Sequence, residues 1–183
     1  AITGKLIPEA LVLEDDAPIP NLYSTRDDTF RVPMILVEFP DYGATYETSK
    51  FDSLMNYEGY THLNYSSTGS FRDFYKEISY GQFIAGVDVS DWFTAEHNHD
   101  YYGYNNGYQR VKRLVRNMVD SLEAAGFDWS IYDNDGDGYV DALNLAHAGP
   151  GAEEGDETNI WSHKSSLGNL AVTYDGVTIS SYN

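Results

Sequence analysis

Hydrophobic residues recur along this chain with distinct spacings, and each spacing predicts a different kind of element. Residues 31–39 are almost continuously apolar and stop at Pro40, which predicts a short strand buried on both faces. Residues 83–93 begin with alternating apolar positions and also predict a strand. A shorter apolar run at 142–146 predicts a third strand, because a Gly-Pro-Gly break follows it.

Helical spacing of about 3.6 residues is clearest over 108–125, where the apolar side chains keep one face and Gly126 ends the run. A second helix is predicted after Ser70, a suitable N-cap, and it should end near Gly81. Residues 49–56 suggest a shorter helix. The second helix carries one apolar stripe, formed by Phe71, Phe74, Tyr75 and Ile78.

The last part of the chain predicts a hairpin. Strand-like runs at 170–174 and 177–182 flank Asp175-Gly176, a dipeptide that favours a tight two-residue turn. Strands thus alternate with helices and then end in a hairpin. This order predicts an α/β or α+β fold, with a mixed, twisted sheet and two main helices.

The chain shows no internal repeat and no clean boundary between domains. Residues 1–30 are irregular and contain several prolines, so we expect an N-terminal arm there, with one short strand at 11–13. Residues 31–183 would form the domain itself. Within it, residues 96–108 are polar and rich in Tyr and Gly, and we expect a loop there.

Acidic residues dominate the charge: 29 Asp and Glu against 11 Lys and Arg give a formal net charge of −18. Nucleic-acid binding is disfavoured, because phosphates need a basic surface, and so is an anionic membrane surface. The carboxylates serve solubility, and bound cations can neutralise some of them. The absence of Cys excludes disulfides, thiolate zinc sites and a Cys nucleophile. No run approaches the roughly 18 apolar residues of a membrane span.

The segment Asp133–Asp141 has the spacing of a calcium-binding loop. Calcium takes about six to eight oxygen ligands, which EF-hand loops supply from alternate positions around a Gly at position 6. Counting from Asp133, Gly138 stands at position 6, and alternate carboxylates converge on one centre, where they would repel without a cation. We therefore predict a calcium site. Its expected ligands are Asp133, Asp135, Asp137, the backbone carbonyl of Tyr139, and Asp141.

The loop departs from an EF-hand at position 12, where Asn144 replaces the bidentate Glu and no helix follows. The last ligand must then be water or one of the acids within 153–157. A metal-free Asp- and Gly-rich turn and a magnesium site are the alternatives. Since the loop joins the long helix to a core strand, we expect the calcium to be structural rather than regulatory.

None of the five His belongs to a His-Glu-x-x-His motif, and there is no Gly-x-Ser-x-Gly and no phosphate loop. His97 and His99 lie two residues apart in the polar loop, where a surface pair is the safer interpretation and a shared metal the alternative. His147 and His163 could line a cleft, although hydrogen-bonded structural roles are commoner. The sequence therefore offers a metal site but no catalytic residue.

Several blocks resemble one known family, and their order and spacing agree with it over roughly residues 31–180. The blocks are 32–41, 69–81, the aspartate loop with Tyr132 before it, 147–153 and 160–163. Together they are similar to the immune inhibitor A-like family of secreted bacterial zinc metallopeptidases. Five blocks in the same order are much more specific than any one of them.

The resemblance implies a catalytic apparatus that this chain does not contain. In that family a His-Glu-x-x-His helix binds zinc through its two His, and its Glu activates water for peptide hydrolysis. The helix follows the strands with which this chain ends, so residues 31–183 would be the N-terminal part of a zincin-like catalytic domain. An edge strand ahead of the helix would pair with the peptide substrate, and we expect 170–174 to be that strand.

The leading hypothesis is a secreted zinc endopeptidase stabilised by calcium, of which this chain is the N-terminal piece and is inactive alone. Its expected partners are a peptide or protein substrate and the C-terminal remainder of the same peptidase. We interpret the end at Asn183 as a proteolytic nick with the remainder still bound, and a chain truncated before expression is the alternative. The competing hypothesis is a non-catalytic, calcium-dependent extracellular binding module, in which residues 101–108 contact a carbohydrate or a protein.

Overall fold

A computed structural model describes residues 29–62, 68–103 and 107–183. The expected N-terminal arm over 1–30 lies outside the described residues, apart from its last two positions, and so does its strand at 11–13. Among the described residues, no helix combines the length and the hydropathy that crossing a bilayer requires.

A three-stranded parallel sheet of order β2-β1-β3 forms the centre of the fold. The central strand β1 (Thr29–Glu38) pairs on one side with β2 (Ile84–Thr94) and on the other with β3 (Asn144–His147). Ile35, Leu36 and Val37 are fully buried at consecutive positions of β1. Consecutive strand residues point to opposite faces, so the prediction of a strand buried on both faces is confirmed.

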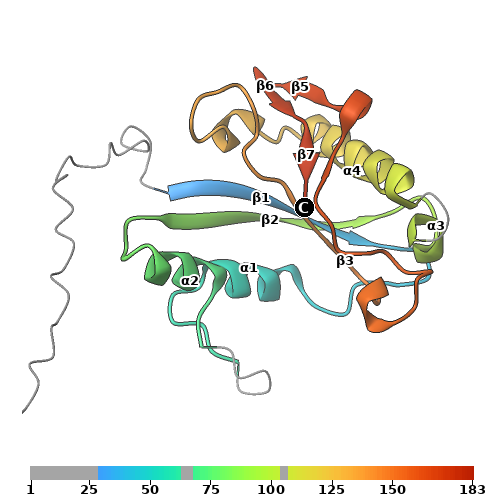
Figure 1. Cartoon of the computed structure of the whole chain (residues 1–183), viewed down its shortest axis with the longest axis horizontal. Helices are drawn as coiled ribbons and strands as arrows, with labels where there is room; N and C mark the ends of the chain where they lie inside the picture. The colour runs from blue at the N-terminus through green and yellow to red at the C-terminus, as the bar shows by residue number, and fades with distance from the viewer. Residues whose placement is uncertain (1–28, 63–67, 104–106) are drawn as a thin grey trace, which may run out of the picture.

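Helices cover the two faces of this sheet from opposite sides (Figure 1). The chain passes from β1 to β2 through α1 (Thr48–Asn56) and α2 (Phe71–Ile78), and from β2 to β3 through α4 (Gly107–Ala124). The two crossovers run in opposite directions along the sheet, and right-handed connections then place their helices on opposite faces. The result is an α/β fold, as predicted.

Each face has its own hydrophobic cluster. Ile35 and Val37 pack on the α4 side with the buried stripe of that helix, which includes Val115 and Val119. Met34 and Leu36 pack on the other side, where α1 and α2 lie. The second cluster has fewer fully buried members, so the α4 face carries the larger part of the core.

The predicted helix after Ser70 forms with the expected cap. The Ser70 hydroxyl accepts the backbone N–H of Asp73, and the Asp73 carboxylate accepts the backbone N–H of Ser70. The apolar stripe of this helix is less buried than its spacing suggests, because Phe74 is 57% exposed and Ile78 is 55% exposed. Among the described residues, the outer part of the stripe has no layer packed against it.

The polar segment 96–108 is not entirely a loop. Residues His99–Gly103 form the short helix α3, and both His99 and Tyr102 are buried. The prediction missed this helical turn, because polar residues and frequent Gly in the segment are more typical of a loop. The close approach of Gly103 to the carbonyl of Thr158 explains one of those glycines, since a Cβ there would overlap the carbonyl oxygen.

The predicted hairpin is present, and its turn has the expected geometry. β5 (Val172–Tyr174) pairs antiparallel with β6 (Val177–Ile179). Asp175 and Gly176 between them have φ of 51° and 84°, as a two-residue hairpin turn of this type requires. The hairpin forms a separate two-stranded sheet and does not extend the central one.

A further pair of strands, absent from the expected elements, links the chain end to the central sheet. β4 (Ser165–Ser166) pairs antiparallel with β7 (Ser181–Tyr182). The next residue, Asn183, donates its N–H to the carbonyl of Leu143 at 2.8 Å and accepts the N–H of Leu145 at 2.9 Å. This is the hydrogen-bond pattern of a parallel pair, so Asn183 links the two-stranded sheet of β4 and β7 to β3.

Candidate functional site

The aspartate loop begins where a short 3-10 turn, Trp129–Tyr132, ends. Gly136 and Gly138 have φ of 81° and 88°, which glycine adopts without strain, and they fold the loop back on itself. Trp129 and Tyr132 are buried in the α4-side core. The start of the loop is therefore fixed, while its tip is exposed.

Three of the predicted ligands come together in the loop. One carboxylate oxygen from each of Asp133, Asp135 and Asp141 lies within 4.8 Å of the other two. Asp137 does not join this group, and its Oδ1 accepts the N–H of Tyr139 at 2.9 Å instead. Among the described residues, none of the acids within 153–157 reaches the cluster.

Asp133 is the buried member of the cluster, with 8% of its surface exposed. Its carboxylate accepts the backbone N–H groups of Gly136, Asp137 and Gly138 at 2.8–3.0 Å. A carboxylate has about four lone-pair positions, so these bonds stabilise its negative charge and still leave room for a cation. The same three bonds would also hold the loop in a metal-free state.

The donor chemistry fits a hard divalent cation. The three converging groups are all carboxylates, which calcium prefers, and within the described part of the chain they are the only set of three potential ligands from His, Cys, Asp or Glu. Three like charges at this separation repel one another, and a divalent cation would remove that repulsion.

The loop is tied to the central sheet through Asn134 and Asp88. The Asn134 side chain accepts the backbone N–H of Arg31 on β1 at 2.7 Å and donates to Asp141 Oδ2 at 3.0 Å. Asp88 on β2 binds the Arg31 guanidinium at 2.6 Å and accepts the Tyr132 hydroxyl at 3.0 Å. Burial first, and then the charge of Asp88, raise the pKa of the Tyr132 phenol. A sequence-only argument had no signal for this network, because its members lie far apart in the chain.

The other side of the loop is tied to the hairpin. Thr178 of β6 donates its N–H to the carbonyl of Gly138 at 2.8 Å and accepts the N–H of Val140 at 3.0 Å. The chain then continues from β6 into β7, which pairs with β4. The loop, the hairpin and the outer strands are thus connected through backbone hydrogen bonds.

Two histidines meet at the carboxyl ends of β1 and β3. The ring centres of His99 and His147 lie 5.3 Å apart, and Phe39 meets the His99 ring edge-on at 4.9 Å. His97 is exposed, whereas only 1% of His99 is exposed, so the interpretation of a surface pair is wrong for His99. Burial, and next the neighbouring His147, lower the pKa of His99 from its ordinary 6.5.

His163 lines a small cavity, and both of its ring nitrogens have partners. Nδ1 lies 2.6 Å from the carbonyl oxygen of Trp161, so it carries the hydrogen and donates. Nε2 lies 2.9 Å from the hydroxyl of Tyr182, which donates to it when the imidazole is neutral. Burial raises the pKa of Tyr182 to about 12. These bonds hold the segment before β4 against β7.

β4 has an open edge. Leu167 donates its N–H to Ser180 at 2.8 Å, so Leu167 faces β7, and alternation turns the N–H and C=O of Ser166 away from it. Among the described residues, no strand pairs with that outer side. A two-residue strand carries no hydrophobic alternation, so no pattern in the sequence could have identified this edge.

Two comparisons place the chain among known proteins. The model of the family described as "Immune inhibitor A peptidase M6, catalytic domain" matches residues 21–182. The chain is also 27% identical over 135 residues to "Immune inhibitor A" of Bacillus thuringiensis subsp. alesti. That match covers 61% of this chain and 20% of the relative, so the chain spans about a fifth of the relative's length.

Proposed function

The chain belongs to the immune inhibitor A peptidase M6 family, and from this membership we propose that it is part of the catalytic domain of a secreted zinc endopeptidase. The family is zinc-dependent. The match spans nearly all of the described domain, and this observation carries the proposal. Because the relative is much longer, we place the zinc-binding helix in the rest of the polypeptide, which would be the partner of this chain.

The residues present here do not fit the zinc site of that family. The sequence contains no His-Glu-x-x-His motif, and within the described residues no third His, Asp or Glu places a ligand atom close to both His99 and His147. No catalytic step is therefore assigned to this chain. Its proposed part in the reaction is to bind and orient the peptide.

The open edge of β4 is the proposed place for the peptide backbone. An extended peptide adds to a sheet edge through main-chain hydrogen bonds, and Ser166 presents an N–H and a C=O for this purpose. Asn183 links β7 to β3, so β4 lies on the side of β7 away from the central sheet, whereas β5 belongs to a separate hairpin. The geometry thus favours β4 over the strand at 170–174 expected from the sequence.

The aspartate loop is proposed to hold a structural calcium ion. Three carboxylates converge there, and hydrogen bonds join the loop to β1 on one side and to β6 on the other. A calcium ion would stabilise both junctions, because it removes the repulsion among the carboxylates. Chelation should therefore lower the thermal midpoint of the protein.

Cleavage of casein by the full-length protein tests the proposal. We expect proteolysis that phenanthroline abolishes and added zinc restores, because zinc would activate the water. Full-length protein that cleaves neither casein nor a mixed peptide library, with zinc and calcium supplied, would support the non-catalytic binding module instead.

A pair of proline substitutions tests the peptide-binding strand. Ser166→Pro removes an outward N–H from β4, and loss of one backbone hydrogen bond should lower kcat/KM by roughly 2- to 10-fold. Thr173→Pro is the matched control. Thr173 pairs with Thr178, and the backbone N–H and C=O of Thr178 bond to the aspartate loop rather than to β5. The N–H of Thr173 therefore also points away from its partner strand, as that of Ser166 does. If kcat/KM falls in Thr173→Pro and not in Ser166→Pro, the peptide binds to β5 and not to β4.

A further inference from the structure

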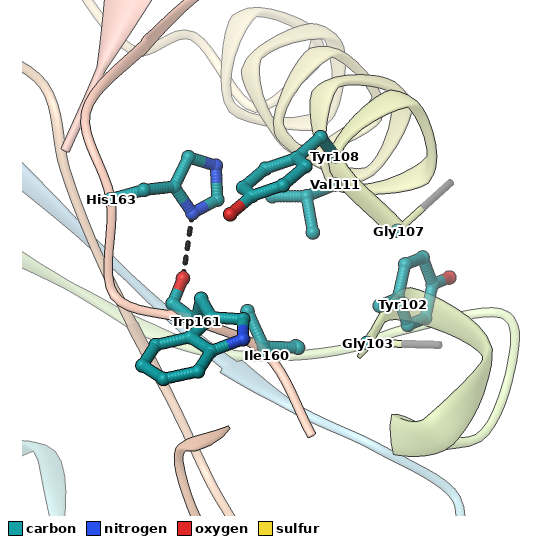
Figure 2. Close-up of a pocket in the computed structure, with 8 residues that line it drawn as sticks. All are labelled: Tyr102, Gly103, Gly107, Tyr108, Val111, Ile160, Trp161 and His163. Atoms are coloured by element: carbon teal, nitrogen blue, oxygen red, sulfur yellow. Dashed lines mark hydrogen bonds between the residues drawn. The ribbon is translucent and has the colours of Figure 1, made fainter. Parts of the chain in front are cut away.

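A small cavity lies between the start of α4 and the segment that leads into β4 (Figure 2). Its volume is about 100 Å³. Figure 2 shows Tyr108 and Val111 of α4 on one side of it and Ile160 and Trp161 on the other. Two glycines complete a lining otherwise formed by Tyr102, Tyr108, Val111, Ile160, Trp161 and His163.

The lining is apolar and aromatic, and it includes no Asp, Glu, Lys or Arg. The only ionisable nitrogen atoms in it belong to His163, and both already have hydrogen-bond partners. The ring of Tyr108 meets His163 edge-on at 4.6 Å, which fixes that wall further. A charged group entering the cavity would lose its water without gaining an ion pair, and apolar atoms form most of the wall, so the cavity favours an uncharged, largely apolar group.

Size restricts the apolar group. An apolar cavity of roughly 150 Å³ takes up a benzene ring, and this one has about two-thirds of that volume. A side chain of the size of Val or Leu suits this volume better than the larger ring of Phe or Trp. Discrimination between such groups in an apolar pocket is about 10- to 200-fold for each extra or missing methylene.

The cavity lies beside the proposed peptide-binding edge. Trp161 and His163 are alternate residues of the segment that becomes β4 at Ser165, so their side chains lie on one face. A peptide added to the open edge of β4 would direct every second side chain to that same face. Trp161 is 45% exposed, which leaves this side of the cavity within reach of a peptide.

We propose that this cavity is a specificity subsite that receives one aliphatic side chain of the peptide held on β4. The proposal rests on the proposed function, because it needs a peptide on that edge. It adds a substrate class: peptides with Val, Leu or a similar side chain at one fixed position from the cleaved bond. Tyr108 and Val111 are the residues that determine the preference.

Two substitutions of opposite effect test the subsite in the full-length protein, with a peptide library varied at each position around the cleaved bond. Tyr108→Ala widens the cavity, so the preference for Leu over Phe at one position should fall at least tenfold. Val111→Ile adds one methylene to the wall, so the preference for Leu over Ala at the same position should fall severalfold. General loosening of the fold would not produce both shifts at one position.

Tyr57→Ala is the matched control, because Tyr57 is 65% exposed and follows α1, away from α4. This substitution should leave the preferences for Leu over Phe and for Leu over Ala unchanged at every position. If the unmodified protein cleaves the library in a zinc-dependent way and both cavity variants keep its ratios within twofold, the subsite is refuted while the peptidase function stands. If the unmodified protein cleaves nothing, the proposed function and the subsite both fail.

Discussion

At the scale of single residues, the carboxylates of the aspartate loop differ in how much the shape of the loop depends on them. Asp133 is buried and accepts three backbone N–H groups, so its charge is held in one position before any cation arrives. Asp135 is more exposed and makes fewer bonds within the loop. Asp133 is therefore needed for the shape of the loop, whereas Asp135 is the better position at which to test metal binding alone.

Asp135→Asn should weaken calcium binding without unfolding the protein. It removes one of three converging carboxylates, and loss of one charged ligand should cost at least about tenfold in affinity. Titration calorimetry of the full-length protein measures the change. Glu47→Gln removes an equal charge from an exposed position outside the cluster and should leave binding intact. If the unmodified protein, Asp135→Asn and Glu47→Gln bind calcium with equal affinity, the loop is not the calcium site.

His99 predicts a loss of stability in mild acid. Its pKa is lowered in the folded protein, so below its ordinary pKa of 6.5 the unfolded chain binds a proton that the folded protein does not. The free energy of unfolding should therefore fall as the pH drops from above 6.5 through the folded pKa. Urea titrations at several pH values measure this, and NMR of the ring should give a titration midpoint below 6.5. A midpoint at or above that value would contradict the burial of the ring.

At the scale of elements, capping residues and turn residues explain where helices and strands begin and end. The capping box at Ser70 fixes the start of α2, although none of its residues is fully buried. A helix with so little burial depends on its cap more than α4 does, because α4 buries a continuous stripe along its length. The two helices should therefore respond differently to similar substitutions.

Ser70→Ala should destabilise the protein by about 0.5–2 kcal/mol, because the N–H of Asp73 loses its acceptor. The matched change in α4 is Ser121→Ala, where the hydroxyl only bonds back to the carbonyl of Asn117. Alanine is the better helix former there, so this control should be neutral or slightly stabilising. Chemical denaturation compares the two. Equal destabilisation by both substitutions would argue against the cap as the cause.

At the scale of the whole molecule, the aspartate loop and the open edge of β4 belong to one connected structure. Backbone bonds join Gly138 and Val140 to Thr178, and the chain then leads through β7 to β4. On its other side the loop is joined to Arg31 of β1. A calcium ion bound at the loop would therefore order the strand proposed to hold the peptide.

Calcium removal should loosen the outer strands and leave the far face of the sheet unchanged. Hydrogen exchange of the full-length protein should accelerate at the amides of Val140, Thr178 and Leu167 when calcium is chelated. The amide of Val87 is an internal reference, because it bonds to Asn56 on the α1 side of the sheet. Uniform acceleration across all four amides would mean global destabilisation, and no change at Leu167 would mean that the loop and the edge are not coupled.

The sequence alone determined the elements with strong local patterns. Strand β1, helix α4, the cap of α2 and the Asp175-Gly176 turn are each encoded within 18 or fewer consecutive residues, through periodicity, capping or φ preference. The aspartate loop is also encoded by consecutive residues, and three of the five ligands predicted from its spacing come together in the structure.

Only the tertiary structure decided what those elements meet. His99 is buried because Phe39, just after β1, and His147, at the end of β3, cover it, while Phe74 stays exposed because no described element packs over it. β4 is too short to have a pattern of its own and exists because β7 pairs with it. Burial and strand pairing depend on partners far away in the chain, and local periodicity carries no information about them.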